Sequence, residues 1–300
     1  MRKFLLRVVF FLIPAFCMLA VAEWYMRTIP NTYRMKNDWM LRNAHNVKTL
    51  LLGNSHGYFA LVPSVMGDSI FNLCNVSQRL ELDYFLLCHY ADRYDSLKQV
   101  ILVADNSNLF DVPMECDEPA RVTYYQLYMG YRAHSMLSKY GFELSNMGYA
   151  HQKLKYHCQG QSVMCDSLGW GYNYVVTDRN PEDFLYKNVR EHLFVNWEYT
   201  YRNRDYIDSI ASWCQQNHVE LVLLQTPVCK HYTRKAASWQ LRLVKAMTDS
   251  CCAKYGARKF DYSCDERFHD IDFFDSDHLS DEGARKFSVI LAHDLHILPQ

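Results

Sequence analysis

Short apolar runs and helical patterns alternate along most of the chain. Five runs have the length of a strand and are bounded by glycine or polar residues, at positions 48–52, 70–73, 99–104, 219–225 and, with a weaker pattern, 258–262. An uninterrupted apolar run of this length is typical of a strand that is buried on both faces. The sequence therefore predicts five buried strands.

Four segments between or after these runs have apolar residues every three to four positions. They lie within residues 80–91, 206–213, 241–247 and 284–291. This spacing predicts helices, and strands that alternate with helices pair in parallel with helices on both faces of the sheet. We expect an α/β fold, a three-layer sandwich with a mostly parallel, flavodoxin-like sheet.

The alternation stops between about residues 108 and 196, a segment rich in tyrosine and tryptophan. A structureless loop of this length is improbable in a compact domain, so we expect an insertion of helices and a folded lid. Aromatic rings stack on sugar rings, but they fill protein cores equally well. The sequence alone does not choose between these two uses.

The most apolar segment lies at the N-terminus, where residues 8–22 are fifteen uncharged, mostly apolar positions. Two interpretations fit it. A signal peptide would have a core of this length, with residues 20–22 resembling a cleavage site. A membrane anchor would extend over residues 4–25, provided that the Arg7 side chain reaches back to the membrane surface.

We favour the anchor because Trp24 and Tyr25 stand where an interfacial belt of aromatic residues would lie. Arg2, Lys3 and Arg7 precede the apolar run, which places the N-terminus in the cytoplasm. Both interpretations export the remainder of the chain. The expected location is the cytoplasmic membrane, with a single pass and a periplasmic domain.

The expected organisation is an anchor at 1–26, a polar stalk or short helix at 27–46, and one domain at 47–300 that carries the insertion. With 49% hydrophobic and 22% charged residues, the chain has ordinary globular composition, which excludes disorder for its bulk. The net charge of -1 provides no general attraction for a polyanion. We therefore expect no nucleic-acid partner.

The cysteines and histidines give no pattern that predicts a metal site. The chain has eleven cysteines and thirteen histidines, without a CxxC pair or an HExxH motif. Ten cysteines follow the apolar segment, and they suit either disulfides in an oxidising compartment or free thiols. If bridges form, Cys158 and Cys165 are the nearest separated pair. We expect no metal and no cofactor.

The first candidate for chemistry follows the first strand, where residues 53–57 read Gly-Asn-Ser-His-Gly. In doubly wound folds, ligands bind at the carboxyl ends of the strands. The flanking glycines permit a tight turn that would present the Ser55 hydroxyl at this edge of the sheet. The alternative is that Ser55 is simply the N-cap of the helix that follows.

The second candidate lies near the C-terminus, where Asp275 stands three residues before His278. Such an Asp can accept the Nδ1 proton of the histidine and leave Nε2 facing a nucleophile. The alternative is a solvated acidic turn in which Ser280 caps the last helix, with Asp281 and Glu282 in its first turn. Capping and catalysis are compatible.

Together the two blocks resemble the SGNH, or GDSL-like, hydrolase family. Gly-Asn-Ser at 53–55 matches the family's first block, and Asp-Ser-Asp-His at 275–278 matches its last. The resemblance implies that Ser55 is a nucleophile, His278 its general base and Asp275 the orienter of His278. Asp277 is the alternative orienter, because some membrane-associated acetylating relatives use an Asp-x-His spacing.

The two middle blocks of that family are poorly matched. The second block contains no glycine, and Ser77 stands nearest to where one is expected, while only Asn106 corresponds to the asparagine of the third block. The resemblance would build the oxyanion hole from the backbone N–H of Ser55, a backbone N–H near Ser77 and the Asn106 amide. Degenerate middle blocks behind one anchor resemble the branch of teichoic-acid D-alanylation and alginate O-acetylation proteins.

The function that this resemblance implies is that of a membrane-anchored, extracytoplasmic serine esterase or O-acyltransferase. Its substrate would be a carbohydrate polymer, and its partner a multispanning membrane acyltransferase. A non-catalytic scaffold that recruits such an acyltransferase is the alternative, which the two degenerate blocks favour. A metal-dependent enzyme comes third, since it lacks a set of ligands.

Overall fold

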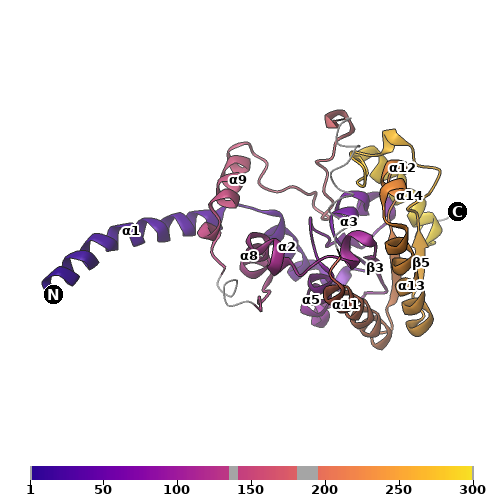
Figure 1. Ribbon diagram of the computed structural model, residues 1–300, viewed down its shortest axis with the longest axis horizontal. Helices are drawn as coiled ribbons and strands as arrows, with labels where there is room; N and C mark the ends of the chain where they lie inside the picture. The colour runs from indigo at the N-terminus through magenta and orange to yellow at the C-terminus, as the bar shows by residue number, and fades with distance from the viewer. Residues whose placement is uncertain (1, 135–140, 181–194, 299–300) are drawn as a thin grey trace. The chain divides into compact units, whose positions relative to one another are not determined.

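The structure is a computed structural model that describes residues 2–134, 141–180 and 195–298. Parts of the expected insertion, residues 135–140 and 181–194, lie outside these ranges. The fold is α/β, with one parallel sheet whose strands are connected by helices (Figure 1). The predicted fold class is confirmed at this level.

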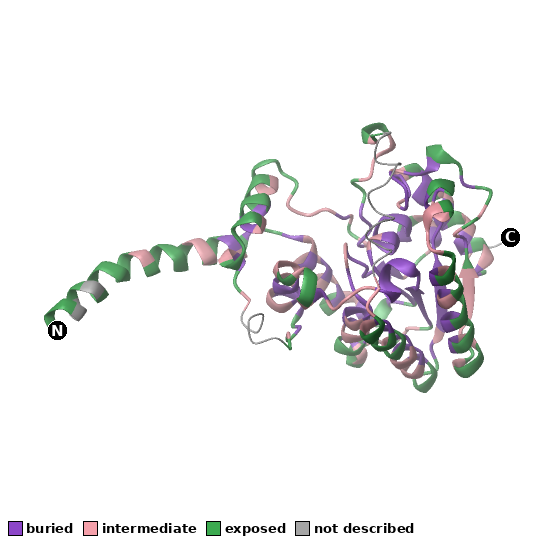
Figure 2. Cartoon of the chain, viewed as in Figure 1, coloured by how far each residue is buried: buried purple, intermediate pink, exposed green. Residues whose placement is uncertain are grey.

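The sheet has five strands in the order β2-β1-β3-β4-β5, and every pair of neighbours is parallel. The strands are β1 (Thr49–Leu52), β2 (Ile70–Asn72), β3 (Gln99–Val103), β4 (Glu220–Gln225) and β5 (Arg258–Asp261). All five predicted strands are therefore confirmed. Strands β1, β2 and β3 are buried at every position (Figure 2), as their apolar runs require, whereas the weakly patterned β5 is a half-exposed edge strand.

Four helices correspond to those that the sequence predicts, namely α5 (Leu80–His89), α11 (Trp197–Gln216), α13 (Ser238–Tyr255) and α14 (Asp281–Asp294). Helix α11 packs against α5 and α13. Helix α14 packs against two short helices, α3 (Ser55–Ala60) and α4 (Pro63–Met66). The remaining short helices around the sheet are α6 (Asn106–Leu109), α7 (Met114–Asp117) and α12 (Lys230–Lys235).

The chain divides into two compact units. One consists of Met1–Asn37 and Glu118–Met164, and the other, which contains the sheet, of Asp38–Asp117 and Cys165–Gln300. The middle of the expected insertion thus folds with the N-terminal segment. Its helices are α8 (Pro119–Met129), η3 (Glu143–Ser145) and α9 (Met147–Cys158), while the segment expected as a stalk or short helix forms α2 (Thr32–Asn43).

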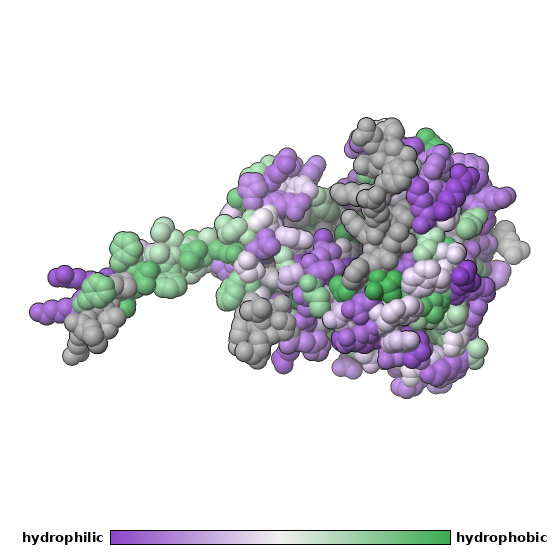
Figure 3. Space-filling model, viewed as in Figure 1, coloured by the Kyte–Doolittle hydropathy of each residue, from purple (hydrophilic) through white to green (hydrophobic). Residues whose placement is uncertain are grey.

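Helix α1 (Arg2–Thr28) contains the apolar segment. Its part from Val9 to Thr28 has a mean hydropathy of 1.8 and is long and apolar enough to cross a membrane by length and composition. Most of its large hydrophobic side chains are exposed. Figure 3 shows hydrophobic residues along most of this helix and hydrophilic ones at its N-terminal end.

The C-terminal part of α1 is hydrogen-bonded to other segments of the N-terminal unit. The Glu23 carboxylate accepts the backbone N–H groups of Glu143 and Leu144, each at 3.0 Å. The Arg27 guanidinium donates to the carbonyl of Gly141 at 3.1 Å, and Lys153 donates to that of Met26 at 2.9 Å. The end of the apolar helix is therefore part of a folded unit.

All eleven cysteines fall within the described residues, and none of them forms a disulfide. Cys158, on the surface, is not bridged to Cys165, which is buried. Of the two interpretations of the cysteines, the structure has the one without disulfides.

Candidate active site

The turn between β1 and α3 presents Ser55 at the carboxyl edge of the sheet. Gly53 has a φ of 140°, and a Cβ at this position would lie 2.7 Å from the Cβ of Val103 on β3. Asn54 is the N-cap of α3, because its side chain accepts the backbone N–H of His56 at 3.0 Å. Asn54 therefore takes the capping role that was the alternative for Ser55.

The C-terminal loop is folded around the carboxylate of Asp275. Its Oδ1 accepts the backbone N–H groups of Asp277, at 3.1 Å, and of His278, at 2.8 Å. The backbone N–H of Phe274 donates to the carbonyl of His278 at 2.9 Å and closes the loop. Ser280 caps α14, as expected. These bonds fix the position of the Asp275 side chain in the loop that carries His278.

The two distant turns meet through side-chain hydrogen bonds. His278 Nε2 lies 2.9 Å from the Ser55 hydroxyl oxygen, and His278 Nδ1 lies 3.0 Å from both carboxylate oxygens of Asp275. A hydroxyl, an imidazole and a carboxylate in this order have the geometry of a nucleophile, its base and the orienter of that base. The structure thus brings together the three residues that the sequence singled out.

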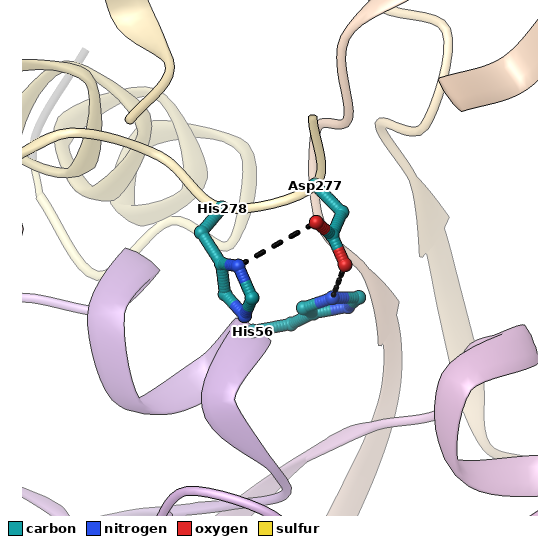
Figure 4. A group of neighbouring side chains, drawn as sticks. All are labelled: His56, Asp277 and His278. Carbon is teal, nitrogen blue, oxygen red and sulfur yellow. Dashed lines mark hydrogen bonds and ion pairs between the residues drawn. The ribbon is translucent and has the colours of Figure 1, made fainter. Parts of the chain in front are cut away.

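Asp277 has a different partner. Its Oδ1 lies 3.6 Å from His278 Nδ1, beyond hydrogen-bond distance, while its Oδ2 lies 3.2 Å from Nε2 of His56 (Figure 4). The geometry therefore favours Asp275 over Asp277 as the orienter of His278.

The charges around His278 raise its pKa. Burial of the ring lowers the pKa, but the neighbouring carboxylates of Asp275 and Asp277 raise it by more, so it stands above the ordinary value. The positive charge of His56 acts in the lowering direction. His278 is therefore a stronger base than a histidine in water, and it holds its proton to higher pH.

Two aromatic rings of a three-ring stack contact His278. Tyr174 is stacked between Phe59, at a centroid distance of 3.7 Å, and Phe274, at 4.1 Å. The rings of Tyr174 and Phe59 stand perpendicular to His278, at 5.4 and 5.6 Å. Tyr174 belongs to the aromatic-rich segment, so at least this tyrosine packs against the histidine and shields it from water.

The two predicted oxyanion residues are not joined to the Ser55–His278 pair. The Asn106 amide donates to the hydroxyl of Tyr232 at 2.8 Å, and Ser77 lies in the loop after β2 with a φ of 58°. Among the described residues, no hydrogen bond connects either side chain to Ser55 or His278. Their role as oxyanion donors stays a prediction.

A buried polar network beside the site was not predicted. His56 Nδ1 lies 2.5 Å from Oδ2 of Asp105, whose Oδ1 accepts the hydroxyl of Ser107 at 2.5 Å. Two signals were present in the sequence: His56 directly follows Ser55, and Asp105 follows the third strand at the same edge of the sheet.

Three side chains at the site have the spacing of metal ligands. His56, Asp277 and His278 each offer one donor atom, all within 4.8 Å of one another. Both ring nitrogens of His56 already face carboxylates, and these carboxylates outweigh burial and raise the pKa of His56 to about 10. A protonated imidazole has no lone pair for a metal. In this arrangement the three residues do not fit a metal ion.

No protein-family model matches the chain, and no curated protein matches it either. A functional assignment must then rest on the geometry of the site and not on sequence similarity to known proteins. Its strongest feature is the hydrogen-bonded chain from Ser55 through His278 to Asp275.

Proposed function

We propose that the protein is a serine esterase or O-acyltransferase of the SGNH type that modifies a cell-surface or exported polysaccharide. The observation that carries the proposal is the chain of hydrogen bonds from the Ser55 hydroxyl through His278 to Asp275. The strand order 2-1-3-4-5 supports a flavodoxin-like sheet. The separate packing of α11 with α5 and of α14 with α3 supports a three-layer sandwich.

The chemistry follows from the positions of the protons. As the Ser55 oxygen attacks the carbonyl carbon of an ester, His278 Nε2 takes the hydroxyl proton, while Asp275 holds the proton on Nδ1. His278 then gives its proton to the departing alcohol oxygen, and the acyl group remains on Ser55. Water or a sugar hydroxyl next attacks this acyl-serine, its proton returning through His278. If water is the acceptor of the acyl group, the protein is an esterase; if a sugar hydroxyl is the acceptor, it is an acyltransferase.

Exposed aromatic rings near this edge of the sheet support a carbohydrate substrate. Trp197 at the start of α11 and Trp239 at the start of α13 are 51% and 40% exposed, with ring centroids 5.6 Å apart. Trp239 also contacts Phe110, which directly follows α6 after β3, at 5.8 Å. Large aromatic faces suit the apolar faces of sugar rings.

Substitution of Trp239 tests this part of the proposal. Trp239→Ala removes a stacking surface but no group of the Ser55–His278 pair. We expect a higher KM for the polysaccharide and unchanged hydrolysis of a small soluble ester such as p-nitrophenyl acetate. An unchanged KM for the polymer would remove Trp239 from its binding surface.

We further propose that α1 anchors the protein in the cytoplasmic membrane and that the sheet-containing unit is periplasmic. The apolar length of α1 and the basic residues Arg2, Lys3 and Arg7 before it support this topology. A multispanning acyltransferase in the same membrane would be the partner that supplies acyl groups.

The second candidate is a non-catalytic scaffold. The observation in its favour is that the Asn106 amide, a predicted oxyanion donor, donates to the Tyr232 hydroxyl. Comparing the acyl-ester content of the surface polymer in Ser55→Ala and Ser64→Ala strains distinguishes the two, since Ser64 is an exposed serine of α4. We expect a changed ester content in the Ser55→Ala strain alone. Identical ester content in both strains would favour the scaffold.

A further inference from the structure

His56 is buried directly beside the proposed catalytic pair. Its side chain is 2% exposed, and its ring lies edge-to-face with that of His278, at a centroid distance of 5.0 Å. Both ring nitrogens are bonded, Nδ1 to Asp105 at 2.5 Å and Nε2 to Asp277 at 3.2 Å. Figure 4 shows Asp277 joined by an interaction to each of the two histidines. In the proposed reaction, His56 neither donates nor accepts a proton.

The partners of His56 define its charge. An ionised carboxylate only accepts hydrogen bonds, so a ring with a carboxylate at each nitrogen must donate from both. Only the doubly protonated imidazolium does so. Although burial lowers the pKa of His56, Asp105 and Asp277 raise it to about 10. His56 is therefore positively charged throughout the neutral range.

We propose that His56 is a positioning residue, a permanent imidazolium that neutralises Asp277 beside the catalytic base and joins three turns of the site. The proposal rests on the proposed serine chemistry. The three turns are those that carry His56 after β1, Asp105 after β3 and Asp277 in the C-terminal loop.

The electrostatic reason lies in the short distance between Asp277 and the base. Among the described residues, Asp275, Asp277 and His56 carry the charges that act most on His278, and the Tyr174 ring packs against it. Asp275 orients the ring, but Asp277, with Oδ1 at 3.6 Å from Nδ1, adds a second negative charge that favours the protonated base. A protonated His278 cannot accept the Ser55 proton. The positive charge of His56 opposes this effect, so that the base is available at lower pH.

A histidine-selective NMR titration of the full-length protein in nanodiscs tests the proposal without using activity. Signals of His56 and His278 are assigned among the thirteen histidines by substitution of each. In the wild type, both nitrogens of His56 should remain protonated at pH 8, and His278 should lose its proton at a lower pH than His56 does. A neutral His56 at pH 8 would overturn the proposal.

Two substitutions should shift the pKa of His278 in opposite directions. His56→Gln leaves Asp277 without its counter-charge, so His278 should keep its proton to higher pH. Asp277→Asn removes the charge itself, so His278 should lose its proton at lower pH. In the double variant His56→Gln/Asp277→Asn the two effects should largely cancel. A His278 titration that none of the substitutions moves would leave His56 with only a structural role.

In each variant, the pH profile for labelling of Ser55 by a fluorophosphonate probe should shift in the same direction as the titration of His278. On the acid side of the pH profile, Ser55 in the His56→Gln variant should be labelled about tenfold more slowly for each pH unit by which the midpoint of the His278 titration rises. If the wild type is not labelled at all, the proposed serine chemistry fails, and the NMR titration still decides the charge of His56. If His56→Gln does not fold, the wild-type titration and Asp277→Asn decide the proposal.

Discussion

In the proposed reaction His278 has two tasks, because Nε2 must be free of a proton to accept one from Ser55 while Nδ1 must keep its own. Asp275 fixes this choice, since its carboxylate lies 3.0 Å from Nδ1 and is itself held by two backbone N–H groups. An amide in its place could donate to Nδ1 and stabilise the wrong tautomer. Asp277 does not fix the tautomer of His278 in this way, because it lies closer to His56 (3.2 Å) than to His278 (3.6 Å).

Substitutions of the two aspartates should therefore have different effects on the labelling of Ser55. Asp275→Asn should slow the labelling of Ser55 by orders of magnitude, on the order of 10⁴-fold as for other triad carboxylates. Asp277→Asn should have a far smaller effect near neutral pH. The measurement is the rate of fluorophosphonate labelling of the two purified variants. An equal or larger loss in Asp277→Asn would make Asp277 the orienter.

The pH dependence of labelling should show a single rise with increasing pH, as His278 loses its proton. The carboxylates of Asp275 and Asp277 raise the pKa of His278, so the midpoint should lie above the ordinary histidine value of about 6.5. The wild-type labelling rate, measured between pH 5 and 9, gives the midpoint. A midpoint below the ordinary value would mean that burial outweighs the carboxylates.

Ser55, Asp275 and His278 could be predicted because each stands in a recognisable block next to a strand or helix end. His56 could not be assigned in the same way. Its role depends on two carboxylates, 49 and 221 residues away in sequence, which only the folded sheet edge brings to its ring. One sequence does not tell which of many aspartates will meet a buried histidine.

Among the elements, the strands were the most predictable, because burial on both faces requires an apolar side chain at nearly every position. The end of α1 was the least predictable. It was expected to lead into a stalk, yet Glu23 bonds to the backbone of Glu143 and Leu144, about 120 residues later. Hydrogen bonds to backbone groups do not depend on the side chain there, so they leave no pattern in the sequence.

This arrangement predicts that the N-terminal segment is retained. Cleavage after Ala22 would make Glu23 the new N-terminus and put a positively charged amino group on a residue that is bonded inside the folded unit. The intact mass of the protein purified from membranes should therefore include the apolar segment. A mature chain that begins at Glu23 would show that the segment is a signal peptide.

In the molecule as a whole, the proposed anchor and the proposed active site belong to different units. The apolar helix α1 and the segment from Glu118 to Met164 form one, whereas Ser55, Asp275 and His278 all lie in the other. The sequence predicted a single domain with an insertion, because the break in alternation was visible. It did not indicate that part of the insertion folds with the N-terminal helix, since that depends on contacts between distant segments.

Covalent labelling of Ser55 tests most simply whether this protein is a serine enzyme. A fluorophosphonate probe should label the full-length wild type at Ser55, and also Ser64→Ala, the matched exposed serine. Ser55→Ala should not be labelled, and His278→Ala should be labelled only weakly, with both variants retaining the circular dichroism of the wild type. An unlabelled wild type, or labelling that persists in a folded Ser55→Ala variant, would contradict the assignment of Ser55 as the nucleophile.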